Sequence, residues 1–295
     1  MAISTLVCLL SETRANELTW DSFKRNVLDT LNADLALCIS TPDGYDFSNN
    51  LWQNAKYKWV SPEYDDFSDG FELARKTDFP ESTCNWRRLL EIKDQWLGGI
   101  KDAHNQHGGS AGILEYFRWF LWKNIRDEKI LEQYDRIIVT RSDFIWLCPH
   151  PPLDLLDETK VWIPRGEFHG GVTDRHAVLS RHNVGAYLNI IKPMLADTDN
   201  LYNRMNYQNC WNLERYIKMR LDEDVGVGNT HFFPYVMYAV RAEGGSTRWS
   251  IGDWDNELGY YVKYRAELHA AREFAKIIKT PESWINFRTL LGPNT

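Results

Sequence analysis

The sequence predicts an α/β fold with a mostly parallel, Rossmann-like central sheet flanked by helices, within one large domain. Residues 137–139 are three consecutive β-branched residues, which indicate the centre of a strand covered on both faces, as in parallel sheets. An apolar run over 6–10, a helical period over 20–31 and a second apolar run over 33–39 form a β-α-β unit. The chain has 295 residues, 43% of them hydrophobic, which is enough to bury a sizeable core.

The remaining patterns predict further elements. A buried helix is expected over 111–126 with Ser110 as its N-cap. Apart from a helix expected over 89–97, the aromatic and acidic region 45–101 supports no assignment. The other expected elements are strands over 161–164 and 177–180, helical stripes over 184–195 and 213–221, a strand over 231–241 interrupted by Pro234, and a final helix over 264–278.

The net charge and the cysteine pattern indicate which classes of binding partner and which cellular compartment to expect. With 34 basic and 41 acidic residues, the net charge of −7 argues against nucleic acid or an anionic membrane as the main partner, because both select basic faces. The five cysteines form no Cys-x-x-Cys pair, so we expect them to be reduced. The first ten residues have no basic leader, and their apolar run is far shorter than the roughly 20 residues of a membrane-spanning helix. These features predict a cytoplasmic protein without a transmembrane segment, and they leave peripheral membrane contact open.

Polar residues follow two of the expected buried strands. Ser11 and Arg14 come after the first strand, and Arg141, Ser142 and Asp143 come after the central one. In open α/β sheets, ligands bind in the crevice beyond the carboxyl ends of the strands, so these side chains are expected to face a ligand. A simple strand-end turn is the structural alternative. The sequence contains no Walker motif, Gly-x-Ser-x-Gly, His-Glu-x-x-His or dinucleotide fingerprint.

Two glycine-bearing stretches are further candidates. Ser110 follows two glycines at the start of a helix, where backbone N–H groups can bind phosphate, although a plain cap is the favoured interpretation. The loop over 165–176 carries six ionisable side chains in twelve positions, and such loops tend to carry function. His176 and His182 are expected to be solvated or satisfied in the core rather than to bind metal.

Four short motifs and their order along the chain carry a resemblance to a known family. They are Ser11-Glu-Thr-Arg14, Gly109-Ser-Ala-Gly112 with Phe117-Arg-Trp119, Tyr134-Asp135 leading into Thr140-Arg-Ser-Asp143, and Gly171-Val-Thr-Asp-Arg-His-Ala-Val-Leu-Ser180. Over about residues 1–245, this order resembles GT-A-type glycosyltransferases, in particular a microbial and viral group associated with surface glycans such as lipopolysaccharide and capsule. The resemblance implies a GT-A-like fold with a nucleotide-sugar (donor) half over 1–147 and an acceptor-binding half over 148–245. For the remaining residues, 246–295, we expect a lid loop and the C-terminal helix.

The resemblance also implies a divalent ion, and here the sequence departs from the family pattern. In such enzymes an Asp-x-Asp turn holds the ion against the donor diphosphate, but Arg141 occupies the first acidic position and only Asp143 remains. Either Asp143 still ligates Mn²⁺ or Mg²⁺, or Arg141 itself neutralises the diphosphate. The structural alternative is an ion pair of Arg141 with Asp135 or Glu132.

On the acceptor side, the resemblance assigns a catalytic carboxylate to the 165–176 loop. An inverting transfer needs a base within hydrogen-bond reach of the attacking hydroxyl. Asp174 and Glu167 are the candidates, with His169 third, while a turn residue holding Arg175 is the alternative for Asp174. The stretch 249–254, with a Trp at each end, is expected either to close over a sugar or to pack in the core.

Together these features predict a glycosyltransferase that moves a sugar from a nucleotide-diphosphate donor to a hydroxyl of a glycan acceptor. The donor residues would be Ser11, Arg14, Ser110, Arg141 and Asp143. A sugar nucleotidyltransferase is one alternative, although the first strand lacks the glycine-rich phosphate loop typical of that class. A non-catalytic glycan-binding or assembly protein on the same fold is the other, and Arg141 in place of the first acid is its best support.

Overall fold

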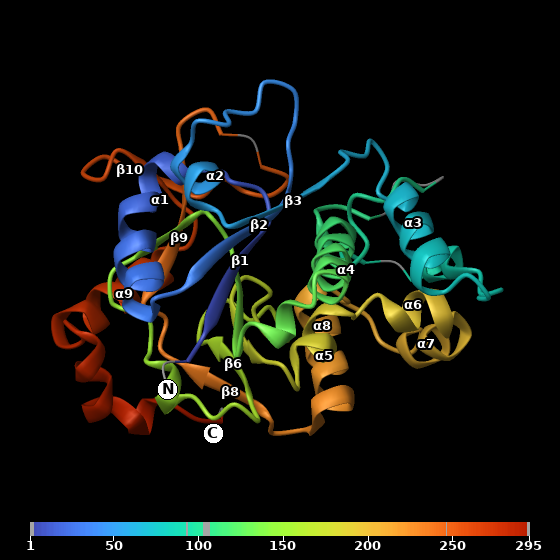
Figure 1. Cartoon of the computed structure of the whole chain (residues 1–295). Helices are drawn as coiled ribbons and strands as arrows, with labels where there is room; N and C mark the ends of the chain where they lie inside the picture. Colours follow the sequence, from blue (N-terminus) through green and yellow to red (C-terminus); the bar gives the residue numbers. More distant parts are fainter. Residues whose placement is uncertain (1–2, 93, 103–106, 246, 294–295) are drawn as a thin grey trace.

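The fold is built on a seven-stranded sheet in the order β3-β2-β1-β4-β7-β6-β8 (Figure 1). The computed structural model describes residues 3–92, 94–102, 107–245 and 247–293. Of the seven strands, only β7 runs opposite to the others, since every neighbouring pair is parallel except the two that contain β7. The strands are β1 (Thr5–Ser11), β2 (Asp34–Ser40), β3 (Tyr57–Ser61), β4 (Arg136–Thr140), β6 (Val161–Pro164), β7 (Ala177–Ser180) and β8 (Thr230–Phe233).

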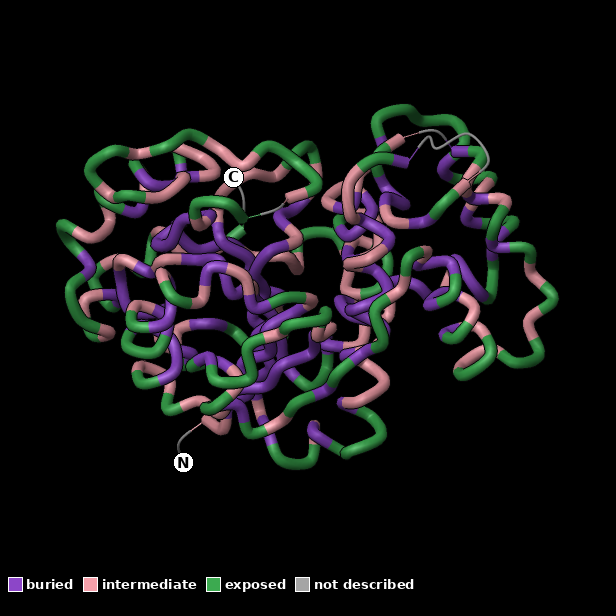
Figure 2. The backbone as a smooth tube through the Cα atoms, turned by 90° about the horizontal axis from the view of Figure 1, so that it is seen from above, coloured by how far each residue is buried: buried purple, intermediate pink, exposed green. Residues whose placement is uncertain are grey.

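Alternating side chains on the strands divide the core into two layers. On β1, Leu6, Cys8 and Leu10 belong to one buried cluster, whereas Val7 and Leu9 belong to another. The helix α4 (Ala111–Asp127) packs over the first layer, and α1 (Asn16–Phe23), with its π-helical continuation (Lys24–Asp29), packs over the second. Figure 2 shows the buried backbone concentrated in this central part of the molecule. The predicted α/β class with a mostly parallel sheet between helices is therefore confirmed.

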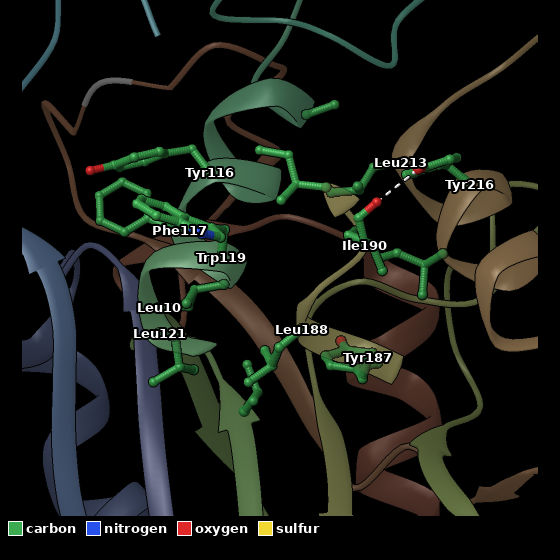
Figure 3. Packing of buried hydrophobic residues seen from close by; sticks show 14 of the residues in the cluster. Leu10, Tyr116, Phe117, Trp119, Leu121, Tyr187, Leu188, Ile190, Leu213 and Tyr216 are labelled. Carbon is green, nitrogen blue, oxygen red and sulfur yellow. Dashed lines mark hydrogen bonds between the residues drawn. The ribbon is translucent and has the colours of Figure 1, made fainter. Parts of the chain in front are cut away.

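Aromatic side chains on α4 account for much of the first layer. Phe117, Trp119 and Leu121 are buried on this helix, close to Leu10 of β1 (Figure 3). To the right of them in Figure 3, Tyr216 donates a hydrogen bond of 2.8 Å to the carbonyl oxygen of Ile190. The helix is buried nearly all round, as its sequence predicts, because it lies between the sheet and the helices that follow.

A second, four-stranded sheet stands beside the first and continues from it. Its order is β10-β11-β9-β5, and all its neighbouring strands are antiparallel. The chain enters it directly after β4, through the Arg-Ser-Asp turn. The strands are β5 (Phe144–Trp146), β9 (Met237–Arg241), β10 (Asp253–Asp255) and β11 (Tyr260–Val262).

The remaining helices are mostly short. The α-helices are α2 (Asn50–Asn54), α3 (Ser68–Asp78), α5 (Val184–Leu188), α6 (Lys192–Ala196), α7 (Thr198–Met205), α8 (Leu213–Leu221) and α9 (Arg265–Ile277). The other helical segments are Trp86–Glu91, Ile130–Glu132, Leu153–Leu155, Asp222–Gly226 and Pro281–Leu290. Among the described residues, no helix combines the length and the apolar character needed to cross a membrane.

Several expected elements differ from those observed. The helix expected over 89–97 is a short 3₁₀ helix, Trp86–Glu91, and residue 93 lies outside the described part of the chain. The unassigned region 45–101 contains α2, β3 and α3. The stripe over 184–195 is divided into α5 and α6, with Pro193 in the first turn of α6.

The expected strand over 231–241 is two strands. Pro234 separates β8, at the edge of the main sheet, from β9 in the second sheet, because proline cannot donate the backbone hydrogen bond that a continuous strand needs. Strands from both 1–147 and 148–245 share the main sheet, while the donor and acceptor roles of these halves remain predictions.

A buried ion pair anchors α9 to the loop before β7. Arg175 donates a hydrogen bond of 2.5 Å to Glu267, and both side chains are almost completely buried. Replacing Glu267 with alanine would leave the guanidinium buried without its counter-ion. We expect Glu267→Ala to lower the free energy of unfolding by about 3–5 kcal/mol, measured by urea denaturation.

Glu273→Ala on the same helix is the control. Glu273 pairs with Lys276 at 2.5 Å, but both side chains are about two-thirds exposed. Exposed ion pairs contribute little to stability, so its urea midpoint should stay close to that of the wild type. Equal losses in the two variants would contradict the anchoring role of Glu267.

Candidate functional site

A cavity of about 470 Å³ lies beyond the carboxyl ends of four parallel strands. We call it the strand-end cavity. It is lined by Ser11 and Arg14 after β1, Ser40 of β2, Tyr64 after β3 and Arg141 after β4. These strands are neighbours in the sheet, so the residues that follow them meet at one edge.

A second cavity, of about 400 Å³, adjoins the first. We call it the helix-side cavity, because Asn212 and Glu214 at the start of α8 line it, together with Asp174, His169 and Tyr264. The two cavities have in common the residues Ser110, Leu114, Arg141, Trp249 and Lys263. These five residues form the junction between them.

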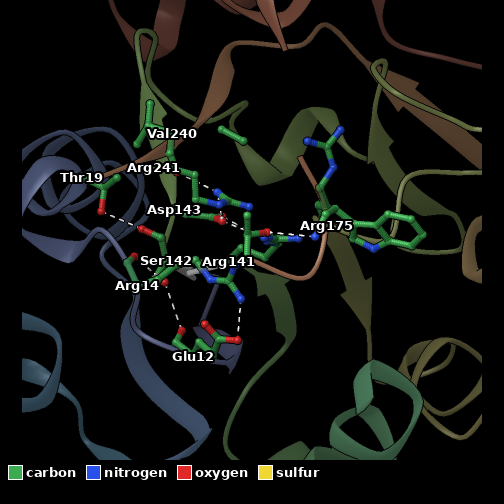
Figure 4. A network of polar contacts seen from close by, with 12 residues as sticks. Glu12, Arg14, Thr19, Arg141, Ser142, Asp143, Arg175, Val240 and Arg241 are labelled. Atoms are coloured by element: carbon green, nitrogen blue, oxygen red, sulfur yellow. Dashed lines mark hydrogen bonds and ion pairs between the residues drawn. The ribbon is translucent and has the colours of Figure 1, made fainter. Parts of the chain in front are cut away.

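Beneath the junction lies a cluster of one carboxylate and two arginines (Figure 4). Asp143 accepts hydrogen bonds of 3.0 and 2.7 Å from Arg141, and a third of 2.5 Å from Arg241. The Asp143 side chain is fully buried, and burial alone would raise its pKa, but the two guanidinium groups hold that pKa well below its usual range. Asp143 is therefore ionised and engaged on both oxygens.

The arrangement around Asp143 does not fit the expected Mn²⁺ or Mg²⁺ site. Both oxygens of its carboxylate already accept from arginines, and Arg141 and Arg241 would repel a divalent cation. Within the described ranges, no cluster of three or more His, Cys, Asp or Glu side chains could hold a metal ion. The ion-pair partners expected for Arg141 are also wrong, because Asp135 pairs with Arg181 and Arg141 pairs with Asp143.

The middle residue of the Arg-Ser-Asp turn positions the turn rather than facing the cavity. The hydroxyl of the buried Ser142 lies 3.1 Å from the carbonyl oxygen of Glu12 and 3.0 Å from that of Arg14. Thr19 on α1 donates a hydrogen bond of 2.6 Å to the Ser142 carbonyl. The loops after β1 and β4 are therefore tied together, which holds Arg14 and Arg141 at the same edge (Figure 4).

Two carboxylates face the helix-side cavity. Asp174 and Glu214 both line it, and burial, followed by the charge of Asp174, raises the pKa of Glu214 to about 7. The 165–176 loop reaches Glu214 because Gly171 lacks a side chain, since a Cβ atom there would lie 2.0 Å from the Glu214 carbonyl oxygen. The buried Arg118 of α4 donates a hydrogen bond of 2.7 Å to the Asp174 carbonyl, which fixes the other side of the loop.

One aromatic side chain covers the junction of the cavities. Trp249 is 43% exposed and lines both cavities. Trp254 is also exposed, so the expectation that these two side chains pack in the core is wrong. The indole of Trp249 lies against Gly109, where an added Cβ atom would come within 2.2 Å of the ring. Gly109 also has a φ of +84°, which favours glycine.

Lys263 is the other cation at the junction. It follows β11, and its backbone N–H donates to the carbonyl oxygen of Ala239 at 2.9 Å. Burial, then the charges of Arg141 and Arg241, lowers the pKa of Lys263 to about 7, although Asp143 opposes this. At the strand-end cavity, the cations therefore outnumber the carboxylates.

The structure brings together most of the predicted site residues. Ser11, Arg14, Ser110 and Arg141 line the strand-end cavity, whereas Asp143 lies behind its wall. The Ser110 side chain makes no cap hydrogen bond, although Ser110 does precede α4 as expected. Asp174 lines the helix-side cavity, as does His169.

Glu167, in contrast, is on the lining of neither cavity. Of the two histidines, His176 is fully buried and bonded to Thr140 at 3.0 Å, and His182 is exposed, as expected.

Sequence reasoning missed Glu214, Arg241 and Lys263. Glu214 lies in the first turn of α8 after the N-cap Asn212, where an acid is ordinary helix chemistry and carries no functional signal. Arg241 ends β9 and Lys263 follows β11, and both strands belong to the second sheet. Only the packing of that sheet against the Arg-Ser-Asp turn brings these two cations to the site.

Comparisons with known proteins show weak structural likenesses. No family model matches the chain, and no curated protein sequence matches it. Mouse xyloside xylosyltransferase 1, in its apo form, aligns over 78% of this chain and 84% of its own, at 10% identity and a TM-score of 0.36. Core-mannan synthase A from Aspergillus fumigatus, in a Mn/GDP form, aligns over 79% and 73%, at 8% identity and a TM-score of 0.41. Likenesses of this strength establish no activity or ligand for this chain.

The carboxylate pair makes a measurable prediction. The charge of Asp174 contributes to the raised pKa of Glu214, so Asp174→Asn should lower that pKa from about 7 towards its ordinary value. The measurement is a ¹³C NMR titration of the glutamate carboxyl groups. Asp199→Asn, an exposed carboxylate that pairs with Arg88, is the control and should leave the Glu214 titration unchanged. An unaltered pKa in Asp174→Asn would show that the two carboxylates do not interact.

Proposed function

We propose that this protein is a glycosyltransferase that moves a sugar from a nucleoside-diphosphate sugar to a hydroxyl group of a glycan. One observation carries the proposal: a cationic cavity at the carboxyl ends of the strands meets a second cavity that holds two carboxylates. A transferase of this kind needs an anion site for the donor diphosphate and a proton acceptor for the attacking hydroxyl, with the reacting carbon between them.

The strand-end cavity suits the donor. Arg14, Arg141, Arg241, Arg248 and Lys263 line it, and guanidinium groups bind phosphate oxygens in bidentate geometry. Ser11 and Ser40 add hydroxyl groups that can hydrogen-bond to phosphate or ribose. Tyr64 offers an aromatic face on which a base can stack.

The helix-side cavity suits the acceptor. The acceptor oxygen would form a bond to the anomeric carbon as the bond from that carbon to the phosphate oxygen breaks, and the electron pair would leave with the diphosphate. The proton of the acceptor hydroxyl would pass to Asp174. Glu214, which is ionised above about pH 7, faces the same cavity and would share this role.

Two other functions remain as outcomes of the test. A nucleotidyltransferase would place a glycine-rich loop after β1, where this chain has Glu12-Thr-Arg14. A glycan-binding protein on the same fold would bind its ligand without turnover.

The deciding experiment combines binding with turnover. UDP, GDP, CDP and dTDP are titrated into the protein by calorimetry, and the corresponding nucleotide sugars are then incubated with it while nucleotide release is measured. Binding of one diphosphate and slow hydrolysis of its sugar, with water in place of the acceptor, would support the transferase. Binding without any turnover would favour a non-catalytic protein, and binding of none of the four would refute the donor site.

Asp174→Asn should separate the two cavities functionally. Loss of a general base typically lowers a rate by about 10²–10⁴-fold, so hydrolysis of the nucleotide sugar should fall by that order, while diphosphate binding stays unchanged. Glu167→Gln is the matched control, because Glu167 is in the same loop but lines neither cavity, and it should keep the wild-type rate. Equal loss in both variants would argue for a structural role of the loop.

The rate should also depend on pH through Glu214. Its pKa of about 7 predicts that hydrolysis rises as the pH increases through 7, because only the ionised form of Glu214 can accept a proton. Glu214→Gln should lower the rate above pH 7 and remove this inflection. A pH profile that is identical in wild type and Glu214→Gln would exclude Glu214 from the proton transfer.

A further inference from the structure

We propose that this site binds the donor diphosphate without a divalent cation, and that Lys263 and Arg141 at the junction of the cavities take the place that a metal ion would have. The inference rests on the proposed function and goes further by naming the groups that neutralise the departing diphosphate. It is carried by the contacts of Asp143, by the distribution of charge around the strand-end cavity and by the position of Lys263.

The first argument is that the acid of the Arg-Ser-Asp turn is already used. A divalent ion needs carboxylate oxygens with free lone pairs that point into the site. Asp143 is fully buried, and it accepts three hydrogen bonds from Arg141 and Arg241, which leave neither oxygen without a cationic partner. The aspartate thus acts as a counter-ion that holds two arginines in place.

The second argument is the surplus of positive charge. Arg141 and Arg241 share the one carboxylate of Asp143, whereas Arg14 has its own partner in Glu12, at 2.5 Å. Lys263 forms no ion pair with any described residue, and neither does Arg248. A sugar-linked diphosphate carries two negative charges, so an uncompensated cluster of this size can neutralise it. Glu63 also lines this cavity, so five cations stand against the three carboxylates Glu12, Glu63 and Asp143, which leaves an excess of two positive charges.

The third argument is the position of Lys263. Its side chain lines both cavities, and the bond that breaks in a transfer must lie where the donor and acceptor spaces meet. The ammonium nitrogen is 5.4 Å from the ring centroid of Tyr264 and has no hydrogen-bond partner among the described residues. A phosphate oxygen at the junction would supply the missing acceptor.

Charged groups of both signs surround Lys263, and the arginines Arg141 and Arg241 influence it more than Asp143 does. Burial and the charges of Arg141 and Arg241 lower the pKa of Lys263 to about 7, so an empty site holds this charge weakly, and a bound diphosphate would restore it. The charged and titratable groups that surround it are Arg141, Asp143, Arg175 and Arg241 within the protein wall, Arg14, Arg248, Glu12 and Glu63 on the strand-end side, and His169, Asp174, Glu214 and Tyr264 on the helix-side cavity.

The test is nucleotide binding with and without metal. UDP, GDP, CDP and dTDP are titrated into the full chain by calorimetry, once in EDTA and once in Mn²⁺. We expect the nucleotide that binds to do so with the same affinity, within about twofold, in both conditions. Binding that needs Mn²⁺, or that is about tenfold or more tighter with it, would overturn this inference and leave the proposed function standing. Failure of all four nucleotides to bind would overturn both.

Substitutions of Lys263 provide the second measurement. In EDTA, Lys263→Met should weaken diphosphate binding by about 10- to 100-fold, which corresponds to one charge-assisted hydrogen bond. Lys263→Arg keeps the positive charge and should restore most of the affinity. Lys276→Met, which removes an exposed lysine of α9, is the control and should bind like the wild type.

The variants also separate binding from folding. If Lys263→Met melts at the wild-type temperature and binds as tightly as the wild type, the role of Lys263 is refuted. If Lys263→Met fails to fold, the role of Lys263 is tested by the diphosphate affinity of Lys263→Arg and by the wild-type titrations in EDTA and in Mn²⁺. If Lys263→Arg folds but shows no measurable diphosphate binding, the charge argument is refuted.

Discussion

The buried carboxylate of Asp143, held between Arg141 and Arg241, is the interaction on which both the fold and the site depend. Arg141 directly follows β4 of the main sheet, Asp143 directly precedes β5, and Arg241 is the last residue of β9 in the second sheet. The backbone N–H of Val240 also donates to the Asp143 carbonyl at 2.9 Å. Because a buried charge is tolerated only when it is paired, this cluster fixes how the two sheets meet. It also makes the wall of the strand-end cavity positively charged, since two guanidinium groups share one carboxylate.

Around this cluster, the loops that form the site are restrained by contacts made elsewhere. Ser142 ties the loop after β1 to the loop after β4, and Arg118 and Gly171 hold the 165–176 loop against α4 and α8. Charged groups held in place before a ligand arrives stabilise developing charge more effectively than groups that must reorganise. The proposed chemistry therefore depends on packing as much as on the charged side chains themselves.

Local patterns account for how much of the site could be predicted. The residues after β1 and β4 were predictable because strand ends meet at one edge of a parallel sheet, so Ser11, Arg14 and Arg141 required only the recognition of two strands. Asp174 was found through the composition of the 165–176 loop together with the family resemblance of that segment. Glu167, from the same loop, points to the limit of that method, because composition does not say which acid faces a cavity. Glu214 does face a cavity, but it belongs to helix α8 and lies 40 residues after Asp174 in the chain.

The sequence by itself determined the α/β class, the buried strands and the helix α4, because these follow from periods of two and 3.6 residues within short windows. It also placed Arg141, Ser142 and Asp143 directly after the central strand. Only the tertiary structure decided what that arginine does. The partner that completes the cluster, Arg241, lies 98 positions from Asp143 and reaches it through the pairing of β9 with β5. Lys263 reaches the junction through β11 in the same way, and no local pattern encodes contacts between strands that are so distant in the chain.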